Sequence, residues 1–182
     1  MMRVSVTVIL IFLSTIPAVA HPGLAGSTGF LEGMFHPLSG IDHVSAMLAV
    51  GAWAAMLGGR MLWHLPLSFV AGAGLGGWLA HLNLPLPLAE PLILASVLFL
   101  GLVALLQLKM NGALAAALVF GFAIAHGFGH VAELPPGSSL LAAGLGFLAG
   151  STLSILAGIT LAGGLGLYRT SSTEVRAPRT TS

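Results

Sequence analysis

The chain has 182 residues, of which 57% are hydrophobic and 6% are charged, and its formal net charge at pH 7 is +1. Soluble globular proteins carry about 25% charged residues, so this composition excludes a soluble domain and favours a protein whose solvent is the lipid bilayer. The low net charge gives no field that would attract nucleic acid. The chain contains no cysteine, which excludes disulfides and thiolate metal ligands.

Residues 1–20 have the pattern of a secretory signal peptide. Arg3 is a positive residue near the start, an apolar stretch too short for a comfortable membrane span follows, and a small-x-small cleavage pattern ends at Ala20. Cleavage there would make His21 the mature N-terminus and leave residues 21–35 as a periplasmic segment. An uncleaved first helix is the alternative.

Five apolar segments follow, each long enough for a helix that crosses the roughly 30 Å hydrocarbon layer. Glycine, proline and asparagine interrupt the chain between them. The expected spans are 36–58, 61–82, 88–108, 112–133 and 139–168. The expected fold class is therefore all-α: a polytopic helical membrane protein with about five transmembrane helices after a cleaved signal peptide. The transmembrane domain would cover residues 36–168, and a polar cytoplasmic tail residues 169–182.

The basic residues predict an orientation for these spans. If the mature N-terminus lies outside, Arg60 and Lys109 fall in cytoplasmic loops, and the arginines of the tail follow the last helix on the same side. This arrangement agrees with the positive-inside rule, which is independent of the hydropathy that defines the spans. We expect a multi-pass protein of the inner (cytoplasmic) membrane, with a periplasmic N-terminus and a cytoplasmic C-terminus.

Three ionisable residues form a stripe in the fourth span. His126, His130 and Glu133 are offset by 0, 4 and 7 positions, which places them within roughly 60° of one helix face. Two imidazoles one helical turn apart are a common way to hold a divalent metal. Because ionisable residues inside a membrane usually mark a site or a pathway, we expect metal or proton handling here. Hydrogen bonds to neighbouring helices are the alternative.

A second polar group lies at the start of the first span. His36 and His43 are seven residues apart and are expected to share one face of a helix that starts with Pro37 in its first turn. Asp42 either orients an imidazole or binds metal directly. A polar cap at the helix entrance is the alternative to a site.

The remaining ionisable residues are weaker candidates. His64 and His81 are expected near the membrane interfaces. Glu32 is either a ligand at the entry to the site or a solvated loop residue, and Glu90 would begin the third span with its carboxylate near the positive end of the helix.

The two histidine motifs resemble those of the HupE/UreJ family of nickel and cobalt permeases. In this sequence they read His36-Pro37-x-x-Gly40-x-Asp42-His43 and His126-Gly127-x-x-His130-x-x-Glu133, and His21-Pro22-Gly23 and Glu90-Pro91 also fit. The resemblance implies transport of Ni²⁺ or Co²⁺ across the cytoplasmic membrane, often in support of hydrogenase or urease. It implies the following residues as carriers of the metal: His36, Asp42, His43, His126, His130 and Glu133.

The chain departs from the family pattern at three places, and the first is Leu24 and Ala25, which follow the N-terminal His-Pro-Gly where members often have further histidines. Val131 stands where glycine usually follows the second histidine of the second motif, and Ser151, Thr152 and Ser154 occupy the last helix, where a histidine is usual. These departures remove possible ligands, and they bear on the identity of the metal and on its affinity.

The expected function is a secondary transporter of a divalent transition metal, which passes through the protein and is not a permanent cofactor. The chain has no nucleotide-binding loop, so the driving force would be the membrane potential, a coupled proton or a partner. Because imidazole binds metal in its neutral form, uptake should weaken as the pH falls through the histidine range. The expected partners are the metal and the bilayer; a homo-oligomer and a link to hydrogenase or urease maturation remain open.

Two alternatives belong to other classes of protein. One is a membrane metal sensor or accessory protein that binds metal without translocating it. The other is a histidine-rich membrane metalloenzyme such as a di-iron oxygenase, which needs more histidines than the two motifs supply and usually places them on the cytoplasmic side. We therefore expect no enzyme.

Overall fold

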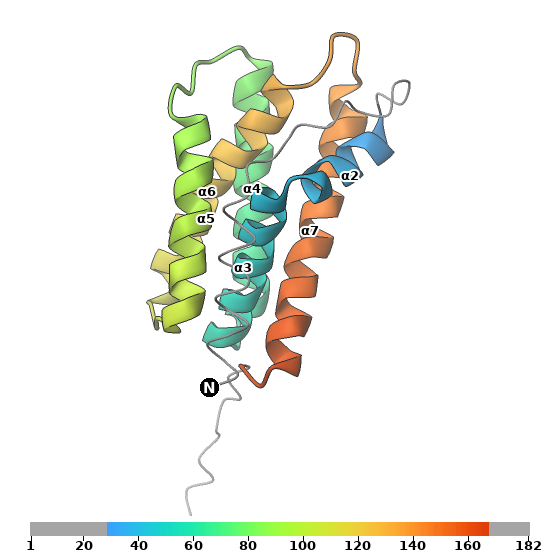
Figure 1. Ribbon diagram of the computed structural model, residues 1–182. Helices are drawn as coiled ribbons and strands as arrows, with labels where there is room; N and C mark the ends of the chain where they lie inside the picture. The colour runs from blue at the N-terminus through green and yellow to red at the C-terminus, as the bar shows by residue number, and fades with distance from the viewer. Residues whose placement is uncertain (1–28, 168–182) are drawn as a thin grey trace, which may run out of the picture.

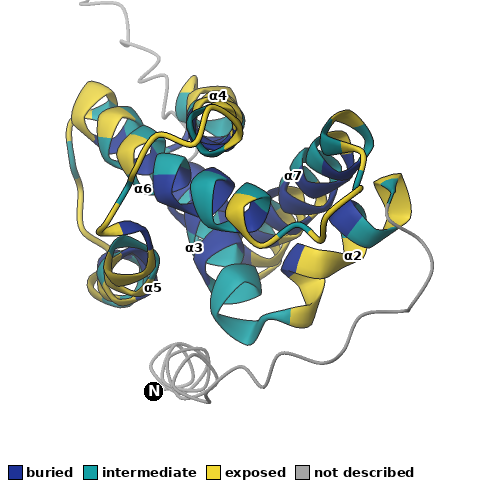
Figure 2. Ribbon diagram, turned by 90° about the horizontal axis from the view of Figure 1, so that it is seen from above, coloured by how far each residue is buried: buried dark blue, intermediate teal, exposed yellow. Residues whose placement is uncertain are grey.

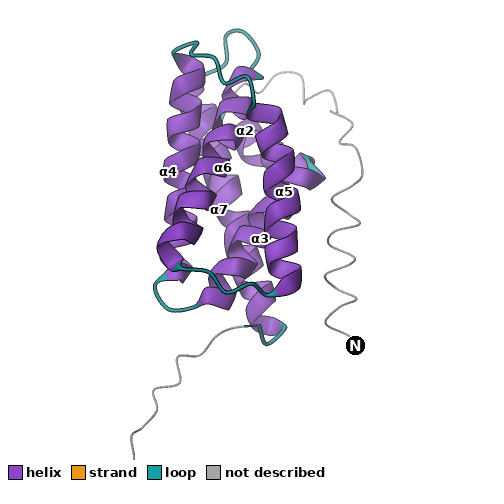
Figure 3. Ribbon diagram, turned by 90° about the vertical axis from the view of Figure 1, so that its left-hand side faces the viewer, coloured by secondary structure: helices purple, strands orange, loops and turns teal. Residues whose placement is uncertain are grey.

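The computed structural model describes residues 29–167, and within this range the chain is entirely helical apart from its loops. All the described helices but the first stand roughly side by side in a bundle, with the loops gathered at its two ends (Figures 1 and 3). The bounds of the helices are α2 Phe30–Ser39, α3 Ile41–Leu57, α4 Met61–His81, α5 Ala89–Leu106, α6 Gly112–Ala132 and α7 Leu140–Gly164. The expected signal peptide and the polar tail lie outside the described residues.

The helix ends follow local sequence. The Asn111 side chain accepts a hydrogen bond from the backbone N–H of Ala113 at 2.9 Å and so caps the start of α6. The Ser139 hydroxyl oxygen does the same for Ala142 at the start of α7. Between α3 and α4, Gly58 has a φ of 68°, a left-handed conformation that ends the helix and that glycine adopts without steric cost.

The expected first span, residues 36–58, is wrong as a single helix. The chain breaks at Gly40, where an extended backbone (φ −95°, ψ 117°) ends α2 and begins α3, and the two helices meet at an angle of 87°. His36 therefore lies on α2 and not on the same helix as His43. Their expected common face does not exist, although both side chains still reach the same part of the bundle.

Helix α3 runs through the middle of the bundle and contacts α4, α5 and α7. Its buried residues include Met47, Trp53 and Ala54, and they join the core formed by the inner faces of the neighbouring helices. Viewed from one end, the buried residues of α3, α6 and α7 face the interior while the outer faces of the helices are exposed (Figure 2). Exposed leucines on those outer faces fit contact with lipid.

Glycines allow the closest helix contacts. A Cβ atom on Gly76 would overlap the carbonyl group of Ile124 in α6, and one on Gly127 would overlap the carbonyl group of Ala73 in α4. Helix α2 is held on α7 in the same way, since a Cβ on Gly146 would meet the backbone of Phe30. Backbone-to-backbone packing thus fixes how α6 and α2, which carry three of the four motif histidines, sit in the bundle.

Three helices, α5, α6 and α7, are long and apolar enough to cross a membrane, and the bent pair of α2 and α3 counts as a fourth if it is one span. This supports a multi-pass helical membrane protein with three to four candidate spans. Helix α4 is as long as α6 but is not among them; it contains His64, Pro66 and His81, which lower its hydropathy. The expected number of about five is thus supported in part.

Candidate functional site

The four histidines of the two motifs come together in one chain of rings. The His36 ring lies 4.8 Å from the His130 ring, His130 lies 4.6 Å from His43, and His43 lies 5.1 Å from His126, measured between ring centroids. Three helices supply them: α2, α3 and α6. The structure thus brings the histidines of the two motifs together, with His130 and His43 in the middle of the series.

The chain of rings leads from the surface into the core. The side chain of His36 is 48% exposed and that of His43 is 19% exposed. His130 is 8% exposed as a residue and His126 only 1%. Helix α6 contributes the two buried rings because residues 126 and 130 lie on its inner face, where Gly127 lets the backbone of α4 approach.

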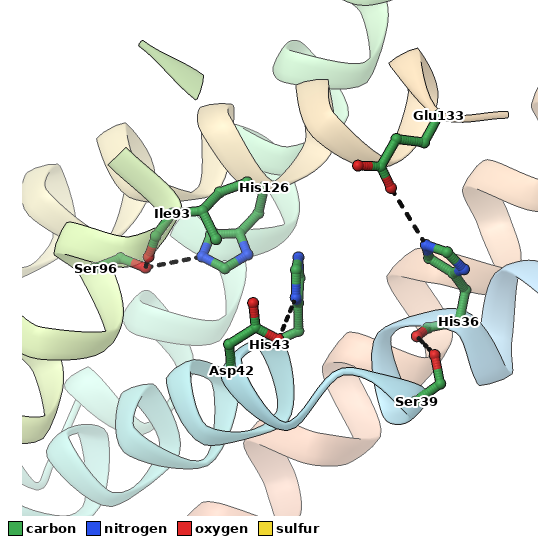
Figure 4. Close-up of polar contacts among 8 residues, drawn as sticks. All are labelled: His36, Ser39, Asp42, His43, Ile93, Ser96, His126 and Glu133. Carbon is green, nitrogen blue, oxygen red and sulfur yellow. Dashed lines mark hydrogen bonds and ion pairs between the residues drawn. The ribbon is translucent and has the colours of Figure 1, made fainter. Parts of the chain in front are cut away.

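Asp42 holds the His43 ring. Its carboxylate oxygen Oδ1 lies 3.0 Å from His43 Nδ1, and a carboxylate only accepts, so Nδ1 donates (Figure 4). His43 Nε2 is then the ring nitrogen with a free lone pair. Two roles were expected for Asp42: to orient an imidazole or to bind metal directly. The contact with His43 is the one that the first role requires.

Several ring nitrogens in the cluster have no partner. Both nitrogens of His130 and the Nδ1 atom of His126 are buried without a hydrogen bond to the described part of the protein. Buried polar groups in proteins are nearly always satisfied, by protein, water or a bound ion, so these atoms are the ones in the cluster that are available to a ligand. Imidazole nitrogens are suited to Ni²⁺, Co²⁺, Cu²⁺ and Zn²⁺ alike, so the donor type does not choose among these metals.

The nitrogen and oxygen atoms of the motif residues do not surround one point. Among residues 29–167, no group of three or more His, Asp or Glu side chains has the geometry to hold a metal ion. Each ring meets its neighbour edge to face, at interplanar angles of 65° to 89°. Coordination by three or more of these residues therefore requires side-chain rotation.

Glu133 lies at the outer end of the series. It follows the last residue of α6, its side chain is 66% exposed, and its Oε2 atom lies 3.8 Å from His36 Nε2 (Figure 4). The expectation that it shares a face with His126 and His130 is met only loosely, because it points to His36 at the rim.

A cavity of about 540 Å³ opens beside this rim, between α2, α4, α6 and α7. Apolar side chains and glycines form most of its wall, and its polar residues are Glu32, His36, His130 and Glu133. The cavity thus reaches His36 and His130, the two histidines at the exposed end of the series. Glu32, a weak candidate from the sequence, lines the same cavity and so lies beside the site.

Other ionisable residues stay outside the cluster. His64 and His81 lie exposed at opposite ends of α4, where His81 packs near Trp78, and Glu90 lies exposed in the first turn of α5. The interfacial positions expected for His64 and His81 stay a prediction, whereas Glu90 lies at a helix start as expected.

Sequence reasoning missed Ser96, which is fully buried in α5 with its hydroxyl 2.9 Å from His126 Nε2 (Figure 4). The signal that could have found it is its isolation, because Ser96 is the one polar side chain of α5 beyond the first turn, which contains Glu90.

Comparison with known proteins identifies the family. The model of the HupE / UreJ protein family matches residues 9–179 of this chain. A curated relative, Protein HupE of Rhizobium leguminosarum bv. viciae, is 39% identical over 148 residues, which cover 81% of this chain and 78% of that protein. No solved structure was found to match the chain. The chain belongs to the HupE/UreJ family, a family of transporter and accessory proteins linked to hydrogenase and urease and not a family of enzymes.

Proposed function

We propose that this protein is a permease that carries a divalent transition metal, Ni²⁺ or Co²⁺, across the cytoplasmic membrane. The observation that supports it most is the series of four imidazoles that leads from the half-exposed His36 to the buried His126. Such a series offers successive nitrogen donors at increasing depth, which a binding site for a single fixed ion does not need. Family membership supplies the choice of nickel and cobalt.

In this proposal five segments cross the membrane, with the bent pair α2 and α3 as one span and α4 as another. Helix α4 has 21 residues, which at 1.5 Å per residue gives about 31 Å, close to the hydrocarbon thickness. Arg60 and Lys109 then lie in the loops at the end of the bundle opposite the cluster. The positive-inside rule places that end in the cytoplasm, so the cluster opens to the periplasm.

The metal would enter through the cavity, where the carboxylates of Glu32 and Glu133 attract a cation, and pass to His36 and His130. His43, held by Asp42, and the buried His126 would receive it next. The membrane potential favours inward movement: two positive charges gain about 4.6 kcal/mol per 100 mV. Delivery of the metal to hydrogenase or urease maturation would follow in the cytoplasm.

Uptake of radioactive nickel by cells that express the chain tests this function. Expressing cells should accumulate nickel above control cells, and excess cobalt should suppress the accumulation more strongly than zinc or copper. Absence of accumulation for both nickel and cobalt, with the protein present in the membrane, would refute the proposed transport.

A substitution in the middle of the series ties that uptake to the cluster. His130→Ala removes the ring that contacts both His36 and His43, so uptake should fall at least ~10-fold. The matched control is His64→Ala, an exposed histidine in α4 outside the cluster, which should keep wild-type uptake. Equal uptake by the two variants would show that the cluster is not the pathway.

A role in binding without translocation is the second candidate. It is favoured by the distribution of donors, because within residues 29–167 His64 is the one histidine near the opposite end of the bundle. A binding protein would retain nickel stoichiometrically when purified, whereas its expression would leave the rate of cellular accumulation unchanged.

A further inference from the structure

Ser96 makes two contacts through one hydroxyl group. Its Oγ atom lies 2.6 Å from the carbonyl oxygen of Ile93, one turn earlier in α5, and 2.9 Å from Nε2 of His126 in α6. Both Ser96 and His126 are almost completely buried, so water does not compete for these contacts. Helix α5 thereby touches the imidazole that lies deepest in the histidine series.

The positions of the protons follow from the inventory of donors. A hydroxyl has one proton, and a carbonyl oxygen can only accept. Two oxygens 2.6 Å apart need a proton between them, so the Ser96 proton is directed to Ile93, as is common for serine in a helix. The hydroxyl therefore offers only a lone pair to His126, and the Nε2 atom of His126 must carry the proton.

His126 is left with a bare Nδ1 atom. This atom is buried and has no partner among the described residues. In Figure 4 it lies on the side of the ring that faces His43, away from Ser96. Its lone pair is thus available within the cluster, and nothing in the described part of the protein satisfies it.

Asp42 fixes the opposite tautomer in the neighbouring ring of His43, with the proton on Nδ1. Because His43 donates from Nδ1 to the carboxylate, its free lone pair is on Nε2. The two rings are nearly perpendicular, at 89°. A carboxylate holds one imidazole and a hydroxyl holds the other, and each leaves the lone pair of a different ring nitrogen for a ligand.

We propose that Ser96 is a positioning residue that holds His126 in its Nε2-protonated tautomer, so that Nδ1 is the atom that takes the metal. The proposal rests on the proposed function, since it concerns the ligand atom of the same site. Outer partners that fix the tautomer of a metal-binding histidine typically contribute 10- to 100-fold to metal affinity. Ser96 is the residue of α5 that performs this task.

The first test observes the tautomer itself, without metal. The full-length protein, labelled with ¹⁵N histidine and reconstituted in lipid nanodiscs, should show a protonated Nε2 and a bare Nδ1 for His126, assigned by comparison with His126→Gln. Ser96→Ala should give a mixture of tautomers or the reverse one, and Ser96→Thr, which keeps the hydroxyl, should resemble the wild type. A wild-type His126 protonated on Nδ1 would overturn the proposal.

The second test measures nickel affinity in the purified protein. Ser96→Ala should bind Ni²⁺ about 10- to 100-fold more weakly, with Ser96→Thr restoring most of the affinity. The matched control is Ser154→Ala, since Ser154 is also buried but bonds only the carbonyl of Gly150 in its own helix. Equal affinities of Ser96→Ala and the wild type would refute the role of Ser96.

The two tests separate the failure of this proposal from that of the proposed function. If the wild type binds neither nickel nor cobalt, the proposed function fails, whereas the tautomer measured in metal-free protein still decides whether Ser96 sets the state of His126. If the wild type binds nickel and the tautomer does not depend on Ser96, only the positioning role is wrong.

Discussion

At the residue scale, the site consists of imidazoles whose orientation depends on second groups. His43 bonds Asp42 and His126 bonds Ser96, whereas both ring nitrogens of His130 are buried without a hydrogen-bond partner among residues 29–167. The His130 ring packs against Phe147, with ring centroids 4.1 Å apart, so ring contacts and not a hydrogen bond hold it in place. The two held rings define the inner end of the series, and the unpartnered ring links it to His36 at the rim.

The charge of Asp42 can be tested without loss of its hydrogen bond. Asp42→Asn keeps an oxygen that accepts from His43 Nδ1 but removes the negative charge, so nickel affinity and uptake should fall by about 10- to 100-fold. Calorimetric titration of the purified variant and uptake in cells measure the two effects. Glu90→Gln is the matched control, because Glu90 is exposed and lies outside the cluster; unchanged affinity in Asp42→Asn would contradict the role assigned to the carboxylate.

At the element scale, glycine contacts set the positions of the helices that bear the site. Gly127 lies between His126 and His130 and meets the backbone of Ala73 in α4, so the site and the α4–α6 contact occupy the same turn of α6. The break at Gly40 acts in a similar way. It turns α2 across the end of the bundle so that His36 and His43 approach His130 from two helices.

A single methyl group in the α4–α6 contact should therefore damage both stability and binding. Gly127→Ala places Cβ against the carbonyl of Ala73, and overpacking of this kind costs about 1–3 kcal/mol and forces the helices apart. Thermal unfolding in detergent should show a lower midpoint, and nickel affinity should fall.

Gly121→Ala is the control in the same helix. Nothing lies within 4 Å of its added Cβ, so stability and affinity should stay at the wild-type level or rise slightly. If both glycine variants unfold at the same temperature as the wild type, close backbone packing does not hold α6 in place.

At the scale of the whole molecule, hydropathy predicted most helices well. The expected span 112–133 corresponds to α6, Gly112–Ala132, because an apolar run ends at asparagine on one side and near a proline pair on the other. The alternating direction of the spans also puts the start of the first span and the end of the fourth on the same side of the membrane, where the structure brings the two motifs together. The function of the individual residues stays a prediction.

Three features could not be read from the sequence, for physical reasons. Glycine is common inside membrane helices, so Gly40 did not signal a bend of 87°. The partner of α2 is decided by glycines of α7, more than a hundred residues away. The contact of Ser96 with His126 depends on how α5 rotates against α6, and one serine in an apolar helix carries no periodic pattern that predicts it.

The placement of the whole bundle in the membrane gives the last prediction. The chain has no cysteine, so each single-cysteine variant carries one thiol that reports one position. Exposed loop positions are available at both ends: Leu84 between α4 and α5, Leu108 between α5 and α6, and Pro136 between α6 and α7. In intact spheroplasts, a membrane-impermeant maleimide should label Leu84→Cys and Pro136→Cys, and should label Leu108→Cys only after permeabilisation.

This pattern follows from the position of the charges. Lys109 adjoins Leu108, and the positive-inside rule keeps that loop in the cytoplasm, while the loops near the histidine cluster carry no basic residue. Labelling of both Leu84→Cys and Pro136→Cys, with protection of Leu108→Cys, also requires α5 and α6 each to cross the membrane. The reverse pattern would open the cluster and its cavity to the cytoplasm, so entry of the metal from the periplasm by way of Glu32, Glu133 and His36 would have to be abandoned.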